Sequence, residues 1–112
     1  PSWQSFVHQS KSDENLFIMP AGSVPSNPSD YLEENRLQTL VSFLKAGFDM
    51  VVIDCPSAAE EPATMLIGKF VEQNIFVLNT ESSTSQTLST LNNLAINEKF
   101  KKISVVLNNK EI

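Results

Sequence analysis

Four short apolar runs, separated by segments of helical periodicity, constrain the fold of this chain more than any other feature. They lie at residues 16–19, 50–53, 75–78 and 103–107. The second and third runs are apolar at every position, as strands covered on both faces of a parallel sheet are. The alternation predicts an α/β fold with the order β-α-β-α-β-α-β. We expect three layers around a mostly parallel sheet with right-handed crossovers.

The segments between the runs predict three helices. The first is expected to be capped by Ser29 or Asp30 and to end where Gly47 adopts a left-handed conformation. The second is expected over residues 58–73, and the third begins after residue 83. The residues expected to face inward are Leu37, Leu40, Val41 and Leu44; Met65, Leu66, Phe70 and Val71; and Leu88, Leu91, Leu94 and Ala95.

The length of 112 residues fits a single α/β domain. Residues 1–14 are expected to form an amino-terminal arm or a short helix, since Trp3, Phe6 and Val7 share one helical face. Residues 15–110 then form the core. In sheets of this kind ligands bind beyond the carboxyl ends of the strands. The segments that follow residues 19, 53, 78 and 107 are therefore the places to look for a site.

Composition argues against nucleic-acid binding and membrane insertion. Thirteen acidic residues outweigh eight basic ones, and the only local basic cluster is Lys99, Lys101 and Lys102. A nucleic-acid surface needs a larger concentration of positive charge. No apolar run approaches the roughly 18 residues that a membrane-spanning helix needs.

One cysteine, Cys55, rules out an intramolecular disulfide and favours a reducing, cytoplasmic environment. The first residues do not resemble a signal peptide. They also lack an initiator methionine, so we expect the chain to be a piece of a longer protein or a processed form. A cytoplasmic part of an inner-membrane protein fits these expectations.

Two segments resemble the bacterial tyrosine kinases of capsular and exopolysaccharide export. Residues 16–32 contain an apolar run, then Pro-Ala-Gly, then Asn-Pro-Ser-Asp-Tyr-Leu. Residues 48–56 read Phe-Asp-Met-Val-Val-Ile-Asp-Cys-Pro, close to the family's Phe-Asp, three apolar residues and Asp-Thr-Pro-Pro. The Asn-Pro-Ser-Asp stretch is the most specific part, and Val-Val-Leu-Asn at residues 105–108 extends the likeness to most of the chain.

The resemblance implies a P-loop fold of the MinD and ParA type and gives two residues a role. Asp54 matches the Walker B carboxylate, which holds Mg²⁺ through water, and a carboxylate at a strand end suits such an ion. From its spacing alone, Asp54 is better explained as a residue that caps the strand-to-helix turn before Pro56. Asn108 matches an asparagine that contacts adenine, or it is simply a turn residue. Cys55 and Ser57 depart mildly from the family pattern.

The phosphate-binding loop of that family is missing from the sequence. No G-x-x-x-x-G-K-[ST] pattern occurs, and Gly68-Lys69-Phe70 falls inside a predicted helix. The tyrosine cluster that such kinases phosphorylate is also missing, and Tyr31 is expected to be a packing residue. The chain is therefore either the later part of a complete kinase or a degenerate domain. The missing first strand belongs near the middle of such a sheet, so its loss is expected to open the core.

Other candidate residues have simpler explanations. Cys55 as a nucleophile would need a neighbouring base, and His8 is the only histidine. Glu60 and Glu61 can serve acid–base chemistry, but acidic residues also suit the first turn of a helix. The sequence assigns no catalytic residue and no phosphorylation site with certainty.

Three functions remain open from the sequence. The first is a kinase-like module of capsular or exopolysaccharide export, regulatory in this form, which associates with itself or with a membrane-anchored polysaccharide co-polymerase. The second is a fragment of an ATP-dependent protein-tyrosine autokinase, for which Mg-ATP binds only when the missing half is supplied. The third is an α/β scaffold of another kind, such as a receiver-like or partitioning-type domain.

Overall fold

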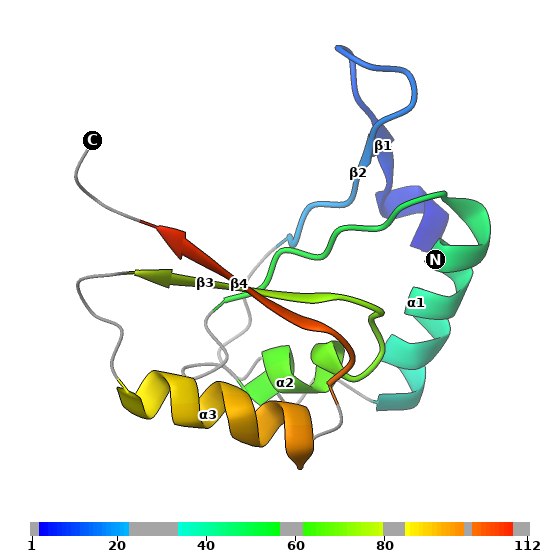
Figure 1. The fold of residues 1–112 in the computed structure, drawn as a ribbon. Helices are drawn as coiled ribbons and strands as arrows, with labels where there is room; N and C mark the ends of the chain where they lie inside the picture. Colours follow the sequence, from blue (N-terminus) through cyan, green and yellow to red (C-terminus); the bar gives the residue numbers. More distant parts are fainter. Residues whose placement is uncertain (1–2, 23–33, 57–61, 80–84, 98–99, 109–112) are drawn as a thin grey trace.

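The computed structural model describes residues 3–22, 34–56, 62–79, 85–97 and 100–108 (Figure 1). Two small two-stranded sheets and three α-helices make up this part of the chain. In order, the elements are the 3₁₀-helix η1 (Trp3–Phe6), β1 (His8–Gln9), β2 (Phe17–Ile18), α1 (Glu34–Gly47), α2 (Pro62–Gly68), β3 (Asn74–Asn79), α3 (Ser85–Ile96) and β4 (Ile103–Asn108). The protein is thus a small α/β structure with one parallel sheet.

The parallel pair β3 and β4 confirms the predicted strands at residues 75–78 and 103–107. Their register runs without a slip from Asn74 opposite Ile103 to Asn79 opposite Asn108. Helix α3 connects them, as a parallel pair requires. In Figure 1, α2 and α3 lie on the same side of this sheet.

Residues 50–53 were expected to form an inner strand, and this expectation is wrong, because the segment is coil. Its exposure nevertheless alternates with a period of two. Met50 and Val52 are 80% and 84% exposed, whereas Val51 and Ile53 are half-buried. Such alternation is typical of an extended chain. None of the described strands pairs with this segment, so it has no strand ladder.

The expected strand at residues 16–19 belongs to a different sheet from the one predicted. β2 pairs antiparallel with β1, with His8 opposite Ile18 and Gln9 opposite Phe17. The polar loop between them closes on itself, since the backbone N–H of Asn15 donates to Oδ1 of Asp13 at 2.8 Å. Local turn chemistry therefore holds this run in a hairpin, and the predicted β-α-β-α-β-α-β order is not seen.

Helix α1 has the buried face that its sequence predicts. Val41 is buried, and Leu37, Leu40 and Leu44 are half-buried. The helix ends at Gly47, but without the predicted left-handed conformation at that residue. Instead, the N–H of Phe48 still donates to the carbonyl of Leu44 at 3.0 Å, so the helical pattern continues past the glycine.

Helix α2 stops earlier than residue 73, where its predicted end lay. The N–H groups of Lys69 and Phe70 bond to the carbonyls three residues before them, which tightens the last turn. Gly68 ends the helix beneath the ring of Phe100. A Cβ atom at Gly68 would come within 2.3 Å of that ring, so only glycine fits there.

The core lies between the parallel sheet and the two helices on its covered face. Leu91 of α3 and Phe100 are buried in it, and the rings of Phe76 and Phe100 stack 6.4 Å apart. Met65, Leu78 and Ile103 pack around them. Leu88 and Ala95, predicted to face inward, are exposed, because a sheet of two strands is too narrow to cover the whole face of α3.

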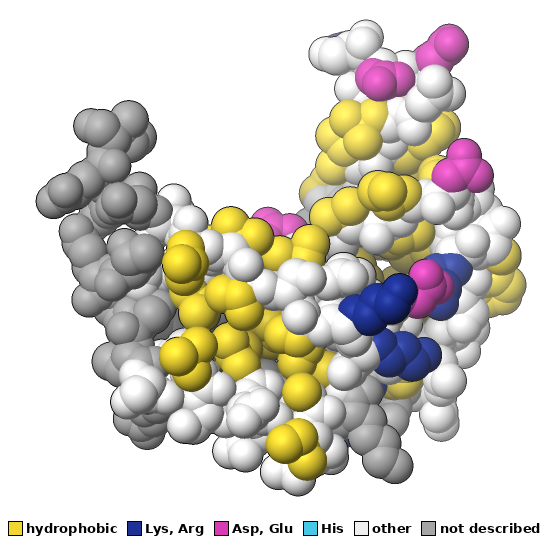
Figure 2. Space-filling view, viewed as in Figure 1, with side chains coloured by type: hydrophobic (Ala, Val, Ile, Leu, Met, Phe, Trp, Pro, Cys, Tyr) yellow, Lys and Arg dark blue, Asp and Glu magenta, His cyan; other side chains and the backbone are white. Residues whose placement is uncertain are grey.

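The other face of the sheet is open among the described residues. Ile75 and Val77 are 62% and 65% exposed, and Val106 of β4, the register partner of Val77, is 49% exposed. Figure 2 shows hydrophobic side chains gathered over this region. The described structure therefore has helices on one face of the sheet and does not display the three layers expected.

Candidate functional site

The two strand ends of the parallel sheet bring Asn79 and Asn108 side by side, since they are register partners. Both are terminal residues of their strands, and Asn108 is exposed. The resemblance to the kinase family had made Asn108 a candidate adenine contact. The residues that follow it, 109–112, lie outside the described part of the chain.

Asp54 lies at the end of the extended coil segment, with its side chain exposed. It is one of the residues around a hollow of about 1150 Å³ between this segment and β3. Residues 49–56 line one side of the hollow, and residues 71–78 line the other. Asn108 does not line the hollow, so the two predicted site residues do not share it.

Cys55, next to Asp54, is a free thiol that is half-buried. Burial raises the pKa of this thiol, and the negative charge of Asp54 raises it further. The thiol is therefore held in its protonated form, which is a poor nucleophile. His8, the only histidine, lies on the exposed strand β1. These observations favour a structural thiol over a nucleophile.

The described residues offer no ready-made metal centre. No group of three or more His, Cys, Asp or Glu side chains gathers anywhere within them. Asp54 as a ligand that holds Mg²⁺ through water stays a prediction, because such sites need only one or two carboxylates when phosphates supply the rest. The thiol of Cys55 and the carboxylate of Asp54 form one polar end of the hollow.

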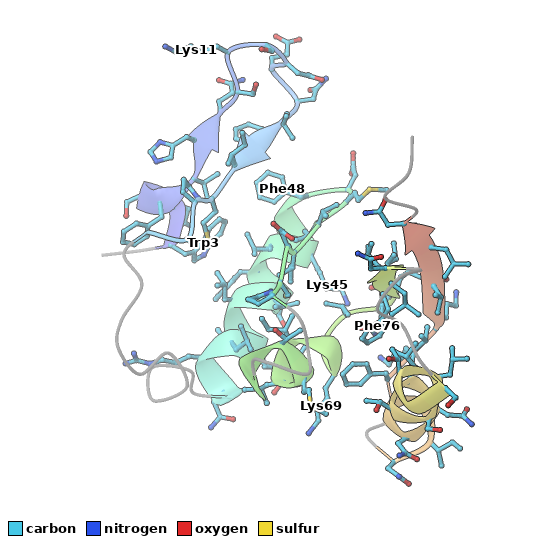
Figure 3. All side chains as sticks on the ribbon, turned by 90° about the vertical axis from the view of Figure 1, so that its left-hand side faces the viewer. Trp3, Lys11, Lys45, Phe48, Lys69 and Phe76 are labelled. Carbon is cyan, nitrogen blue, oxygen red and sulfur yellow. The ribbon has the colours of Figure 1, made fainter. Side chains whose placement is uncertain are left out.

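An ion pair marks the opposite end of the hollow, and sequence reasoning missed it. Lys45 of α1 lies 2.7 Å from the carboxylate of Glu72. Lys45, together with Lys101 and Lys102, lowers the pKa of Glu72 below its ordinary value, with the hydrogen bond from Lys45 as the largest cause. Figure 3 shows Lys45 reaching from α1 towards the strands. These residues are far apart in the sequence, which gave no signal for the pair.

A second missed feature is a polar corner built on Asn74. This buried side chain donates from Nδ2 to the carbonyls of Gly68 and Lys101, at 3.2 and 3.1 Å. Gln73 beside it donates to the carbonyl of Lys102 at 3.0 Å and to Oγ of Ser104 at 2.7 Å. The corner joins the end of α2 to the start of β4. Its role is structural, since every buried polar atom there has a partner.

Several residues singled out in the sequence lie outside the described part of the chain. They are Ser29, Asp30, Tyr31, Ser57, Glu60, Glu61 and Lys99. Lys101 and Lys102, which are described, are exposed and lie near Glu72. Among the described residues, no helix has both the length and the apolar character needed to cross a membrane.

Comparison with known proteins points in one direction. Tyrosine-protein kinase wzc of Salmonella typhi is 28% identical over 76 residues, which is 68% of this chain and 11% of that protein. Tyrosine-protein kinase etk of Escherichia coli K12 is 27% identical over 86 residues, or 73% of this chain and 12% of that protein. This chain is similar to bacterial tyrosine-protein kinases. Tyrosine-protein kinase YwqD of Bacillus subtilis is 19% identical over 93% of this chain and 44% of its own length.

The resemblance to tyrosine-protein kinases that the sequence predicted is confirmed by these individual relatives. No protein-family profile matches the chain. No solved structure matches it either. The chain spans between 10% and 44% of the length of the curated relatives it matches. Their whole-protein activity therefore does not pass directly to this chain.

Proposed function

We propose that this chain is a kinase-like cytoplasmic module of capsular or exopolysaccharide biosynthesis and export, and that it acts in this form by interaction rather than by catalysis. The observation that carries the proposal is the similarity to tyrosine-protein kinases in a sequence that holds no G-x-x-x-x-G-K-[ST] loop. Without backbone N–H groups and a lysine to cradle phosphates, a lone carboxylate binds nucleotide weakly.

The proposed ancestry is a P-loop domain of the MinD and ParA type. Asp54 follows an extended apolar segment and stands beside β3, which is compatible with a Walker B position. In that reading, residues 50–53 are a strand that has lost its neighbour. Asn108, at the end of β4, is the proposed adenine contact of the ancestral site.

The proposed partner is a membrane-anchored polysaccharide co-polymerase or a second copy of this chain. The support is the open apolar face of the parallel sheet, where Ile75 and Val77 are each more than 60% exposed and Val106 is 49% exposed. A monomer rarely leaves such side chains together without a use for them. No part of this proposal requires a nucleic acid or insertion into a bilayer.

A calorimetric titration of magnesium-ATP into the chain tests the proposal. We expect no saturable heat up to about millimolar nucleotide, because the phosphates have no cradle. Asp54→Asn serves as the matched variant, and its titration should be indistinguishable. Micromolar binding that is lost in Asp54→Asn would instead establish the second function, a fragment of an ATP-dependent autokinase.

A further inference from the structure

Three lysine side chains surround a single carboxylate near the start of the parallel sheet. Lys45 of α1 binds Glu72 at 2.7 Å, and the positive charges of Lys101 and Lys102 also act on this carboxylate. We call Lys45, Lys101 and Lys102 the lysine cluster. Figure 2 shows basic side chains gathered around an acidic one beside the sheet. The surface is therefore locally positive, although the formal net charge of the chain is −5.

The turn before β4 is built so that its two lysines lie on the same side. Lys102 has a φ of 41°, a left-handed conformation that residues with a side chain adopt at a cost. Its carbonyl accepts hydrogen bonds from the N–H of Asn74 at 2.9 Å and from Nε2 of Gln73 at 3.0 Å. Nδ2 of Asn74 donates to the carbonyl of Lys101 at 3.1 Å. Both carbonyls are thus held by the start of β3, and both lysine side chains remain exposed.

The left-handed residue explains how neighbouring lysines act on one carboxylate. In an extended chain, successive side chains point to opposite sides. The conformation of Lys102 breaks this alternation, and the charges of Lys101 and Lys102 both reach Glu72. The hydrogen bonds from Gln73 and Asn74 therefore support a conformation that presents two positive charges together.

Glu72 shows which chemistry the lysine cluster accepts. Its side chain is 73% exposed and that of Lys45 is 45% exposed, so water reaches both partners of the ion pair. Exposed ion pairs contribute little to stability, so a carboxylate from outside can replace Glu72 on Lys45 at small cost. The exposed side chains of Lys101 and Lys102 can each bind a further carboxylate.

We propose that the lysine cluster binds an acidic peptide segment with several carboxylates, and that Glu72 is the internal carboxylate with which this segment competes. The cluster is an open surface, which suits an extended peptide better than a small molecule that needs an enclosed pocket. It lies at the Asn74 and Ile103 end of the sheet, whereas Asn79 and Asn108 lie at the other end. The proposal goes beyond the kinase-like function and does not depend on it.

NMR titration with an acidic peptide tests the site. The probe is the capped peptide Gly-Glu-Glu-Gly-Glu-Glu-Gly, and its control has glutamine in place of every glutamate. At low salt the amide signals of Glu72, Lys101 and Lys102 should shift saturably, with a Kd of about 1 mM or tighter. Raising the salt to about 0.3 M should weaken binding by about fivefold, because salt screens exposed charges. An acidic peptide that causes no saturable shift, or no larger shift than its glutamine control, would overturn the proposal.

Charge-matched variants separate the cluster from the overall charge of the chain. Lys102→Gln should weaken peptide binding by about threefold or more, whereas Lys11→Gln, in the exposed hairpin, should change the affinity by less than about 1.5-fold. Glu72→Gln should strengthen binding by about threefold, because it removes the competing carboxylate and releases Lys45. Glu14→Gln, also in the hairpin, is its control and should have little effect. Equal effects within either pair of variants would contradict the proposed site.

Anionic lipid is the competing ligand for exposed lysines. The parent chain and Lys102→Gln should sediment to the same small extent with vesicles of phosphatidylcholine and phosphatidylserine, because the net charge of the chain opposes a negative surface. Vesicle binding that is lost in Lys102→Gln, without binding of the acidic peptide, would overturn the proposal in favour of a membrane surface.

Discussion

At the scale of single residues, the neighbouring atoms constrain two positions, Gly68 and Cys55. Gly68 lies under the ring of Phe100, and Cys55 holds a thiol that is half-buried beside a carboxylate. Neither constraint is visible in the sequence, where Gly68 looks like an ordinary helix residue. Both become testable once the neighbouring atoms are known.

Gly68→Ala should destabilise the protein by about 1–3 kcal/mol, because the new methyl group would collide with the Phe100 ring and overpack the core. Urea denaturation followed by circular dichroism measures the change. The matched control is Gly47→Ala, where nothing lies within 4 Å of the added Cβ. Its free energy of unfolding should not fall, and it should rise by up to about 1 kcal/mol, because Gly47 has a helical conformation that alanine favours. Similar losses in both variants would contradict the contact with Phe100.

The thiol of Cys55 should react slowly with iodoacetamide at neutral pH. Its pKa is raised, first by burial and then by Asp54, so little thiolate is present. The pH midpoint of the reaction rate should lie higher in the native protein than in the same protein unfolded in urea. Asp54→Asn should lower that midpoint, because one cause of the raised pKa is removed. A native midpoint at or below the unfolded one would refute the burial argument.

At the scale of elements, the sequence predicted what local pattern dictates and failed where neighbours decide. The stripe from Leu37 to Leu44 and the two-faced run at residues 75–78 gave α1 and β3 correctly. The run at residues 50–53 has the same composition as β3, yet it is coil, because a strand exists only when another strand pairs with it. The run containing Phe17 formed a strand, but with a partner that the pattern could not identify.

The candidate site was predictable only in part for the same reason. The sequence placed Asp54 and Asn108 after apolar runs, and the structure puts both at segment ends. It could not foresee that only Asp54 lines the hollow beside β3. The Lys45–Glu72 pair depends on how α1 lies against the turn before β3, which no local pattern encodes.

Asn74 holds α2 to β4, so its replacement tests an element-level link. Asn74→Ala removes the side-chain donors to Gly68 and Lys101 and leaves the buried carbonyl of Gly68 without this partner, which should cost about 1–3 kcal/mol of unfolding free energy. Asn92→Ala, at an exposed position of α3, is the control and should change stability by less than about 0.5 kcal/mol. Equal losses of unfolding free energy in the two variants, measured by denaturant titration, would contradict a stabilising role for Asn74 between α2 and β4.

The Lys45–Glu72 pair should make stability depend on pH in the acid range. The pKa of Glu72 is lowered in the folded state, so the stabilisation is complete above the unfolded pKa of about 4.3 and is lost as pH falls through the folded value. Lys45→Met should reduce this loss, seen as a smaller drop in Tm between pH 6 and pH 3. Lys11→Met, on the exposed hairpin turn, should keep the drop of the parent. Identical profiles for all three proteins would show that the pair is unimportant.

At the scale of the whole molecule, apolar surface is left open along one side. Only Val41, Leu91 and Phe100 are buried hydrophobic side chains among the described residues, while many large ones stay exposed. The hairpin touches the rest through contacts such as the Phe17 and Phe48 rings, 5.5 Å apart. The molecule therefore combines a small core with a large apolar surface, which favours association.

The exposed face of the sheet should bind the dye ANS, and the double variant Val77→Thr with Val106→Thr should bind less of it. Threonine keeps the branched shape that suits a strand, so the free energy of unfolding should change by less than about 1 kcal/mol. Fluorescence titration at equal protein concentration measures the dye. Unchanged emission from a folded double variant would place the accessible apolar surface elsewhere.

The parallel pairing of β3 and β4 also affects the expected folding rate. Neither strand can dock until the intervening helix has shortened the distance between them, so ordering of residues 74–108 is expected to limit the folding rate. Truncation of Leu91 should slow refolding, whereas truncation of Phe17 in the hairpin should mainly speed unfolding. Stopped-flow measurements giving the reverse assignment would mean that the amino-terminal end organises first.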